Sequence, residues 1–154
     1  MHSDSLDAAA AAKALGYKVK VDTNGSFPEA LATLLKEEYV DYVAMDIKNS
    51  PQKYALTCGR DDVLEKVSTS VDILKNSSID FEFRTTVTGN LHELDDFEEI
   101  GKWIFGAEKY FLQPFAESED LLDKSRDYRV SRKFVDDALN IVQRYVPGAA
   151  VRGK

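Results

Sequence analysis

The sequence has little of what metal centres and nucleic-acid surfaces require. Of its 154 residues, one is cysteine, Cys58, and two are histidine. A single thiol builds neither an internal disulfide nor a metal site on its own, so we predict a reduced cysteine in a reducing compartment. Acidic residues outnumber basic ones by 27 to 20, which gives a net charge of −7. This balance argues against a phosphate-backbone partner, and we predict no nucleic-acid binding.

Long apolar runs are also missing. No stretch approaches the ~20 apolar residues that cross a bilayer, so no membrane partner is expected. The first residues lack the basic segment and apolar stretch of a signal peptide, which favours a cytoplasmic location. Hydrophobic residues make up 44% and charged residues 31% of the chain, as in an ordinary globular protein. We take residues 1–154 as a single domain.

Strand and helix patterns alternate along the chain. Strands are predicted at 17–23, 40–48, 80–87, 108–115 and 149–153, and helices at 7–15, 28–38, 61–77, 94–105 and 131–146. In the last helix the predicted apolar stripe is Phe134, Ala138, Ile141 and Tyr145. Strands separated by long helices indicate βαβ units and a parallel sheet. Residues 116–129 are interpreted as a loop that crosses the carboxyl edge of the sheet.

The predicted strands carry apolar side chains on one face and charges on the other, because alternate residues of a strand face opposite sides. Val43 and Met45 share one face, for example, and Asp46 and Lys48 share the other. A sheet covered on both sides would be apolar on both faces. We therefore predict helices on one face only. The polar face either lines a ligand cavity, which we favour, or holds a network of ion pairs that satisfies itself.

Four short motifs follow one another in a specific order. "DTNG" (22–25), "VDYVAMDIK" (40–48), "FEFRTTV" (81–87) and "YFLQPF" (110–115) are each weak alone. Together they resemble the radical S-adenosylmethionine (SAM) superfamily. Within it, the chain is similar to the activating proteins of anaerobic (class III) ribonucleotide reductase and of pyruvate formate-lyase. The resemblance implies a partial (β/α)6 TIM-like barrel of parallel strands, here without its first two strands.

The resemblance also implies the chemistry. In that family a reduced [4Fe–4S] cluster cleaves SAM to a 5′-deoxyadenosyl radical, which removes a glycine hydrogen from a partner glycyl radical enzyme. An electron donor protein is implied as well. By position, the resemblance assigns these residues to the SAM site: Asp22, Thr23, Asn24, Asp46, Lys48, Arg84 and Gln113. It implies that Lys48 faces the methionine carboxylate, that Arg84 reaches the ligand and that Gln113 borders the adenosine region. Asp22 and Asp46 are implied as ligands of a monovalent cation.

One departure from the family pattern is large. The cluster is held by a C-x₃-C-x₂-C loop that this sequence lacks, as it lacks the "GGEP" segment that binds the SAM amino group. Cys58 lies far from the expected place. We therefore expect the cluster only in a full-length protein, and expect this chain alone to generate no radical. The strand at 17–22 would then leave an open edge, which predicts self-association.

Two other functions remain as alternatives. One is a non-catalytic partial barrel that binds a nucleoside-like ligand or a partner protein. The other is an unrelated α/β enzyme such as a metal-dependent hydrolase. The second is disfavoured, because such sites need histidine at strand ends, and His2 and His92 lie in the N-terminal tail and a loop.

Overall fold

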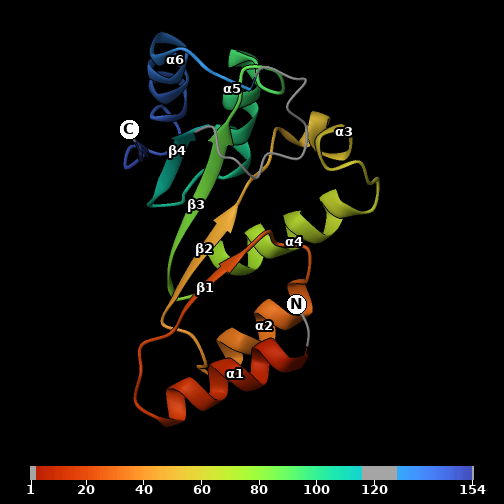
Figure 1. Ribbon diagram of the computed structural model, residues 1–154, viewed down its shortest axis with the longest axis vertical. Coiled ribbons are helices and arrows are strands. Elements are labelled where there is room, and N and C mark those ends of the chain that lie inside the picture. Colours follow the sequence, from red (N-terminus) through yellow and green to blue (C-terminus); the bar gives the residue numbers. More distant parts are fainter. Residues whose placement is uncertain (1–2, 116–127, 154) are drawn as a thin grey trace.

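Five parallel strands form one sheet in the order of the sequence. A computed structural model describes residues 3–115 and 128–153. The strands are β1 (Lys20–Thr23), β2 (Tyr42–Asp46), β3 (Asp80–Val87), β4 (Tyr110–Pro114) and β5 (Ala150–Val151). Their order is β1-β2-β3-β4-β5, and every neighbouring pair is parallel. Figure 1 labels the first four of them. This arrangement confirms the predicted α/β class and puts the carboxyl ends of all strands at one edge.

One helix precedes the first strand, and the others lie between consecutive strands. They are α1 (Ser3–Ala14), α2 (Pro28–Lys36), α4 (Val63–Lys75), α5 (Leu94–Trp103) and α6 (Arg132–Val142). Between β2 and α4 the structure adds the 3-10 turn η1 (Pro51–Lys53) and the short helix α3 (Tyr54–Cys58), which the sequence pattern did not predict. Both are too short to show a helical repeat of apolar residues. Within the described ranges, no helix is both long and apolar enough to span a bilayer.

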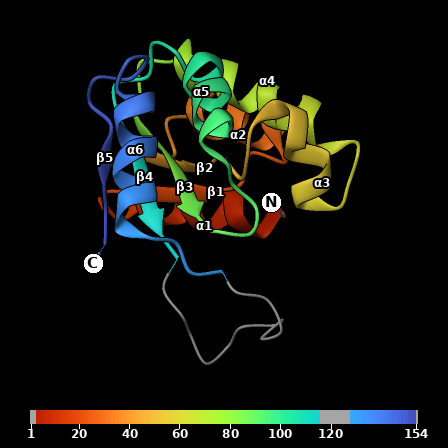
Figure 2. The ribbon, with the colours of Figure 1, turned by 90° about the horizontal axis from the view of Figure 1, so that it is seen from above.

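The helices cover one face of the sheet, as predicted. Figure 2 shows α2, α4 and α5 on the same side of the strands, and α6 packs against α5. Val43, Met45, Phe83 and Leu112 point to that side and are fully buried in a single apolar core. On the opposite face, Asp22 keeps 59% of its side chain exposed. The sheet therefore has one covered face and one open, polar face.

The buried stripes of the helices follow the predicted spacing, with one shift. In α4 the buried Val67, Val71 and Leu74 recur at helical spacing, and in α5 the buried Phe97 and Ile100 do the same. In α6 the buried residues are Val135, Ala138 and Val142. Ala138 belongs to the predicted stripe, but its other members, Phe134, Ile141 and Tyr145, are only half-buried. The buried line lies about one residue around the helix from the predicted one, and the three half-buried side chains pack against the core from its margin.

The turn after β1 requires glycine. Gly25 has a φ of +74°, and a Cβ there would lie 2.2 Å from the Met45 Cε. The Ser70 hydroxyl donates a hydrogen bond of 2.8 Å to the Gly25 carbonyl. The positive φ is what favours glycine here, and the hydrogen bond from Ser70 holds the turn against α4.

At the edges of the sheet, β1 has a strand neighbour on one side only within the described residues. The expected self-association through this edge therefore stays a prediction. Most of the predicted loop at 116–129 lies outside the described residues.

Candidate functional site

Charged side chains from three neighbouring strands meet at the carboxyl end of the sheet. Asp46 on β2 and Arg84 on β3 are register partners, and Asp22 lies near the end of β1. The Arg84 guanidinium contacts both carboxylates, with Nη1 3.1 Å from Asp22 Oδ1 and Nη2 3.0 Å from Asp46 Oδ1. One arginine therefore links the ends of three strands, on the face that strand alternation predicts for these residues.

Lys48 brings a second cation to the same place. It follows the end of β2 by two residues, and its Nζ lies 2.9 Å from Asp46 Oδ2. Since Arg84 and Lys48 hold the two oxygens of one carboxylate, they lie on the same side of the sheet. Lys20 Nζ lies 3.4 Å from Asp22 Oδ1. We call these five residues the strand-end cluster; its three cations and two carboxylates leave one net positive charge.

Exposure rises from the centre of the strand-end cluster outward. The side chain of Arg84 is 16% exposed, that of Asp46 31%, and that of Lys48 44%. An ammonium has three N–H donors, and Asp46 accepts from one of them. The carboxylates are thus satisfied inside the cluster while Lys48 keeps donors for a ligand. This arrangement suits a ligand with an anionic group, although the ion pairs also satisfy one another in the chain alone.

The "DTN" residues differ in what they do. Thr23 Oγ1 accepts a hydrogen bond of 3.1 Å from the Gly25 amide, and Asn24 Oδ1 accepts one of 3.0 Å from the Ser26 amide. These two side chains therefore shape the turn after β1, as Thr and Asn commonly do. Of the three, only Asp22 takes part in the strand-end cluster.

Gln113 lies on the same face but further along. It is the register partner of Thr86 on β3, two residues beyond Arg84. Partners in a parallel sheet point to the same side, so Gln113 borders the open face. Among the described residues no hydrogen bond joins it to the strand-end cluster.

A groove of about 430 Å³ opens beside Lys48. Asn24, Lys48, Tyr54, Cys58 and Leu91 are among its lining residues. Burial raises the pKa of the Cys58 thiol, and the Lys48 charge offsets this only in part. The thiol is therefore protonated near neutral pH, which makes Cys58 a weak nucleophile and a poor metal ligand in this state.

Comparison with known proteins finds a relative of the chain. The chain is 31% identical, over 160 aligned positions and 93% of its length, to a Methanocaldococcus jannaschii protein named as a candidate glycyl-radical enzyme activating enzyme. The chain is therefore similar to glycyl-radical enzyme activating enzymes. It spans 65% of the length of that relative. No family profile matches the sequence.

A solved structure shares the fold of this chain. A domain of pyruvate-formate lyase-activating enzyme from Bacteroides vulgatus superposes with a TM-score of 0.69 at 10% identity, covering 96% of this chain and 89% of that one. At this identity the likeness concerns the fold alone. It confirms the predicted architecture, a parallel sheet with flanking helices like part of a TIM-type barrel.

The iron–sulfur cluster of radical SAM activating enzymes does not fit the residues of this chain. A cluster of this kind is held by three cysteine thiolates, and the sequence has only Cys58. Within residues 3–115 and 128–153, no three His, Cys, Asp or Glu side chains gather as a metal site would need. Asp22 and Asp46 both contact Arg84, so a monovalent cation between them would have to replace that contact.

Sequence reasoning missed a second ion pair on the open face of the sheet. Arg152, just after β5, donates to both oxygens of Glu82 on β3, with Nη2 2.9 Å from Oε2. The Tyr42 hydroxyl donates to the same oxygen at 2.7 Å. Burial raises the pKa of Glu82, but these hydrogen bonds outweigh it and leave that pKa below its ordinary value. Strand alternation did place Glu82 on the polar face. Nothing in the sequence indicated that Arg152, 70 residues away, would be its partner.

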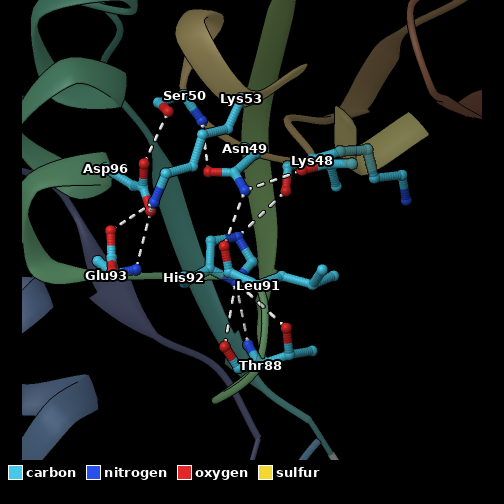
Figure 3. A network of polar contacts seen from close by, with 10 residues as sticks. Lys48, Asn49, Ser50, Lys53, Thr88, Leu91, His92, Glu93 and Asp96 are labelled. Carbon is cyan, nitrogen blue, oxygen red and sulfur yellow. Dashed lines mark hydrogen bonds and ion pairs between the residues drawn. The ribbon is translucent and has the colours of Figure 1, made fainter. Parts of the chain in front are cut away.

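A buried polar network behind Lys48 was also missed (Figure 3). Asn49 Nδ2 donates to the Leu91 carbonyl at 3.0 Å, and His92 contacts the Lys48 carbonyl through Nε2 at 3.1 Å. Deeper in the network, Ser50 Oγ donates to Asp96 Oδ1 at 2.8 Å. These contacts tie the loop after β2 to the loop before α5. Polar residues in two predicted loops gave no sign of their burial, since that burial depends on how the loops pack together.

Proposed function

We propose that this chain forms the SAM-binding wall of a radical SAM activating enzyme. The single observation that carries the proposal is the strand-end cluster, in which Lys48 and Arg84 converge on Asp46 at the carboxyl ends of parallel strands. Parallel α/β sheets place ligands at this edge. Similarity to a protein named as a glycyl-radical enzyme activating enzyme supports SAM as the ligand. When bound, SAM supplies the adenosyl group whose carbon–sulfur bond is cleaved in this superfamily.

Each residue of the cluster has a separate task in this proposal. Lys48 binds the methionine carboxylate, because it keeps free N–H donors and is nearly half exposed. Arg84 is mostly buried and already contacts Asp22 and Asp46, so it orients these carboxylates and adds positive charge below the ligand. Asp22 is the most open of the group and can accept a hydrogen bond from the ligand's amino group. Together they bind a zwitterion in one orientation.

The flanking residues complete the ligand wall. Gln113 lies on the same face beyond Arg84, where we place the adenosine part of the ligand. Thr23 and Asn24 act through the turn that they shape, which fixes the end of β1. We propose that the radical step takes place only in a protein that carries the cysteine loop, with a glycyl radical enzyme as partner. An anaerobic ribonucleotide reductase is the partner that the sequence motifs favour, and an electron donor protein is needed. A cytoplasmic location is part of the proposal.

Binding calorimetry with two ligands tests the proposal. SAM carries the carboxylate that Lys48 is proposed to bind, whereas 5′-methylthioadenosine lacks the amino acid. With few exposed contacts, SAM affinity for this chain should be on the order of millimolar. Lys48→Met should weaken SAM binding about tenfold and leave 5′-methylthioadenosine unchanged. Lys66→Met is the matched control, because Lys66 also makes an exposed ion pair, with Asp62, but on α4. Equal SAM affinities of the unaltered chain, Lys48→Met and Lys66→Met would refute the site.

The alternative is a non-catalytic partial barrel, and the single cysteine is the observation that favours it. Anaerobic reconstitution with iron and sulfide separates the two functions. This chain should show no stable cluster absorbance and release no 5′-deoxyadenosine from SAM. A protein extended by an upstream cysteine loop should show stable cluster absorbance and release 5′-deoxyadenosine from SAM. If the extended protein also fails, the non-catalytic function is the better explanation.

A further inference from the structure

Lys48 lies beyond the end of β2, so among the described residues its peptide groups make no strand-to-strand hydrogen bonds there. They form hydrogen bonds with side chains instead. The strand ends at Asp46, and Ile47 still bonds to β3 through its amide. The Lys48 amide then donates 3.2 Å to the Tyr54 hydroxyl, while its carbonyl lies 3.1 Å from His92 Nε2. Both peptide groups that define the backbone of Lys48 are therefore fixed by residues from other segments.

The hydrogen bonds of His92 define which ring nitrogen carries the proton. The Thr88 amide lies 3.2 Å from Nδ1, and a main-chain N–H can only donate. Nδ1 therefore accepts, so in the neutral ring Nε2 carries the hydrogen and donates it to the Lys48 carbonyl. The ring connects the end of β3 to the residue that we assign to the ligand carboxylate (Figure 3).

His92 is well suited to hold that position. Its side chain is buried, and its ring packs against Phe97 with centroids 5.5 Å apart. The neighbouring Asn49 is buried too and bonds to Thr57 Oγ1 and to the Leu91 carbonyl. The loop after β2 is thus fixed on both sides of the Lys48 peptide, and only the four-carbon stem of Lys48 remains free to move.

We infer that His92 is a positioning residue: through the Lys48 carbonyl it fixes the Lys48 backbone, and so aims the ammonium at Asp46 and at the ligand carboxylate. The identity of that ligand rests on the proposed function. Without the hydrogen bond from His92, the backbone and side chain of Lys48 would sample more conformations. Ordering them when the ligand binds would then lower the affinity. His92 touches neither the ligand nor Asp46.

The test combines a double-mutant cycle with two ligands. His92→Leu should weaken SAM binding about tenfold and leave 5′-methylthioadenosine unchanged. In the Lys48→Met background, His92→Leu should have no further effect on SAM, because it acts through Lys48. Ser50→Ala is the matched control, since it removes a buried hydrogen bond to Asp96 from the same network without touching the Lys48 peptide. His92→Gln retains a side-chain N–H donor, should recover part of the affinity, and replaces His92→Leu if that variant does not fold.

Hydrogen exchange at the Lys48 amide gives a readout that needs no ligand. Exchange should become about tenfold faster in His92→Leu and stay unchanged in Ser50→Ala. Faster exchange with no SAM affinity in the unaltered chain would reject the proposed ligand and keep the positioning role. Unchanged exchange in His92→Leu, or additive effects of His92→Leu and Lys48→Met on SAM binding, would overturn the inference.

Discussion

The two faces of the sheet divide the work of the molecule between them. Phe83 and Arg84 are adjacent on β3, yet Phe83 is fully buried among helices and Arg84 lies among charges on the open face. On the covered face, apolar contacts stabilise the fold by removing area from water. On the open face, the charged side chains form ion pairs with one another, and Lys48 keeps N–H donors for a ligand. A single alternating strand therefore serves both stability and binding, and substitutions on its two faces should have different effects.

The largest effect is expected from a pair of substitutions at adjacent positions. Phe83→Ala should lower the free energy of unfolding by about 3–5 kcal/mol, because it leaves a cavity in the core. Arg84→Ala should cost less stability but abolish measurable SAM binding, since Asp22 and Asp46 lose the cation that joins them. Urea denaturation and calorimetry measure the two properties. If Arg84→Ala proved as destabilising as Phe83→Ala, the proposed division between the faces would be wrong.

How far the sequence predicts the molecule depends on the range of the interactions. The strand at 80–87 is found where the alternation placed it, because that pattern is local. Asp22, Asp46, Lys48 and Arg84 converge because carboxyl ends of parallel strands meet at one edge. The burial of His92 and the pairing of Glu82 could not be predicted, since each depends on a partner at least 40 residues away. α3 was missed because five residues cannot show a helical repeat.

A smaller loss of stability should follow from a change on the open face itself. Glu82 is buried although it lies on that face, and Arg152 and Tyr42 both donate to it. Glu82→Gln keeps the shape but removes the charge, and should cost about 2 kcal/mol of unfolding free energy. SAM affinity should not change, because Glu82 lies toward the other end of β3. A loss of SAM binding at full stability would show that the ligand site extends to Glu82.

The buried network should make stability depend on pH. Burial lowers the pKa of His92, and the neighbouring Asp96 and Lys53 add opposing charges. In the unfolded chain His92 takes up a proton with an ordinary pKa of about 6.5, whereas in the folded chain it takes up the proton only at lower pH. Stability should therefore be constant above a pH of about 6.5 and fall as the pH decreases, by about 1 kcal/mol one unit below it. Urea denaturation at pH values around and below about 6.5 measures the free energy of unfolding. His92→Gln should remove the part of its pH dependence that comes from His92. An identical pH profile in His92→Gln would assign the effect to other groups.

The smallest effect on stability should come from the outer ion pair of the strand-end cluster. Lys20 and Asp22 lie 3.4 Å apart with about half of each side chain exposed. Exposed pairs contribute little, so Lys20→Gln should change the free energy of unfolding by less than about 0.5 kcal/mol. The same change removes the net positive charge of the cluster, and should weaken SAM binding about two- to threefold at low salt. Calorimetry in rising salt should show the difference between the two proteins disappear, because screening acts on exposed charges. A difference that persists at high salt would mean that Lys20 contacts the ligand directly, and would extend the binding site along β1.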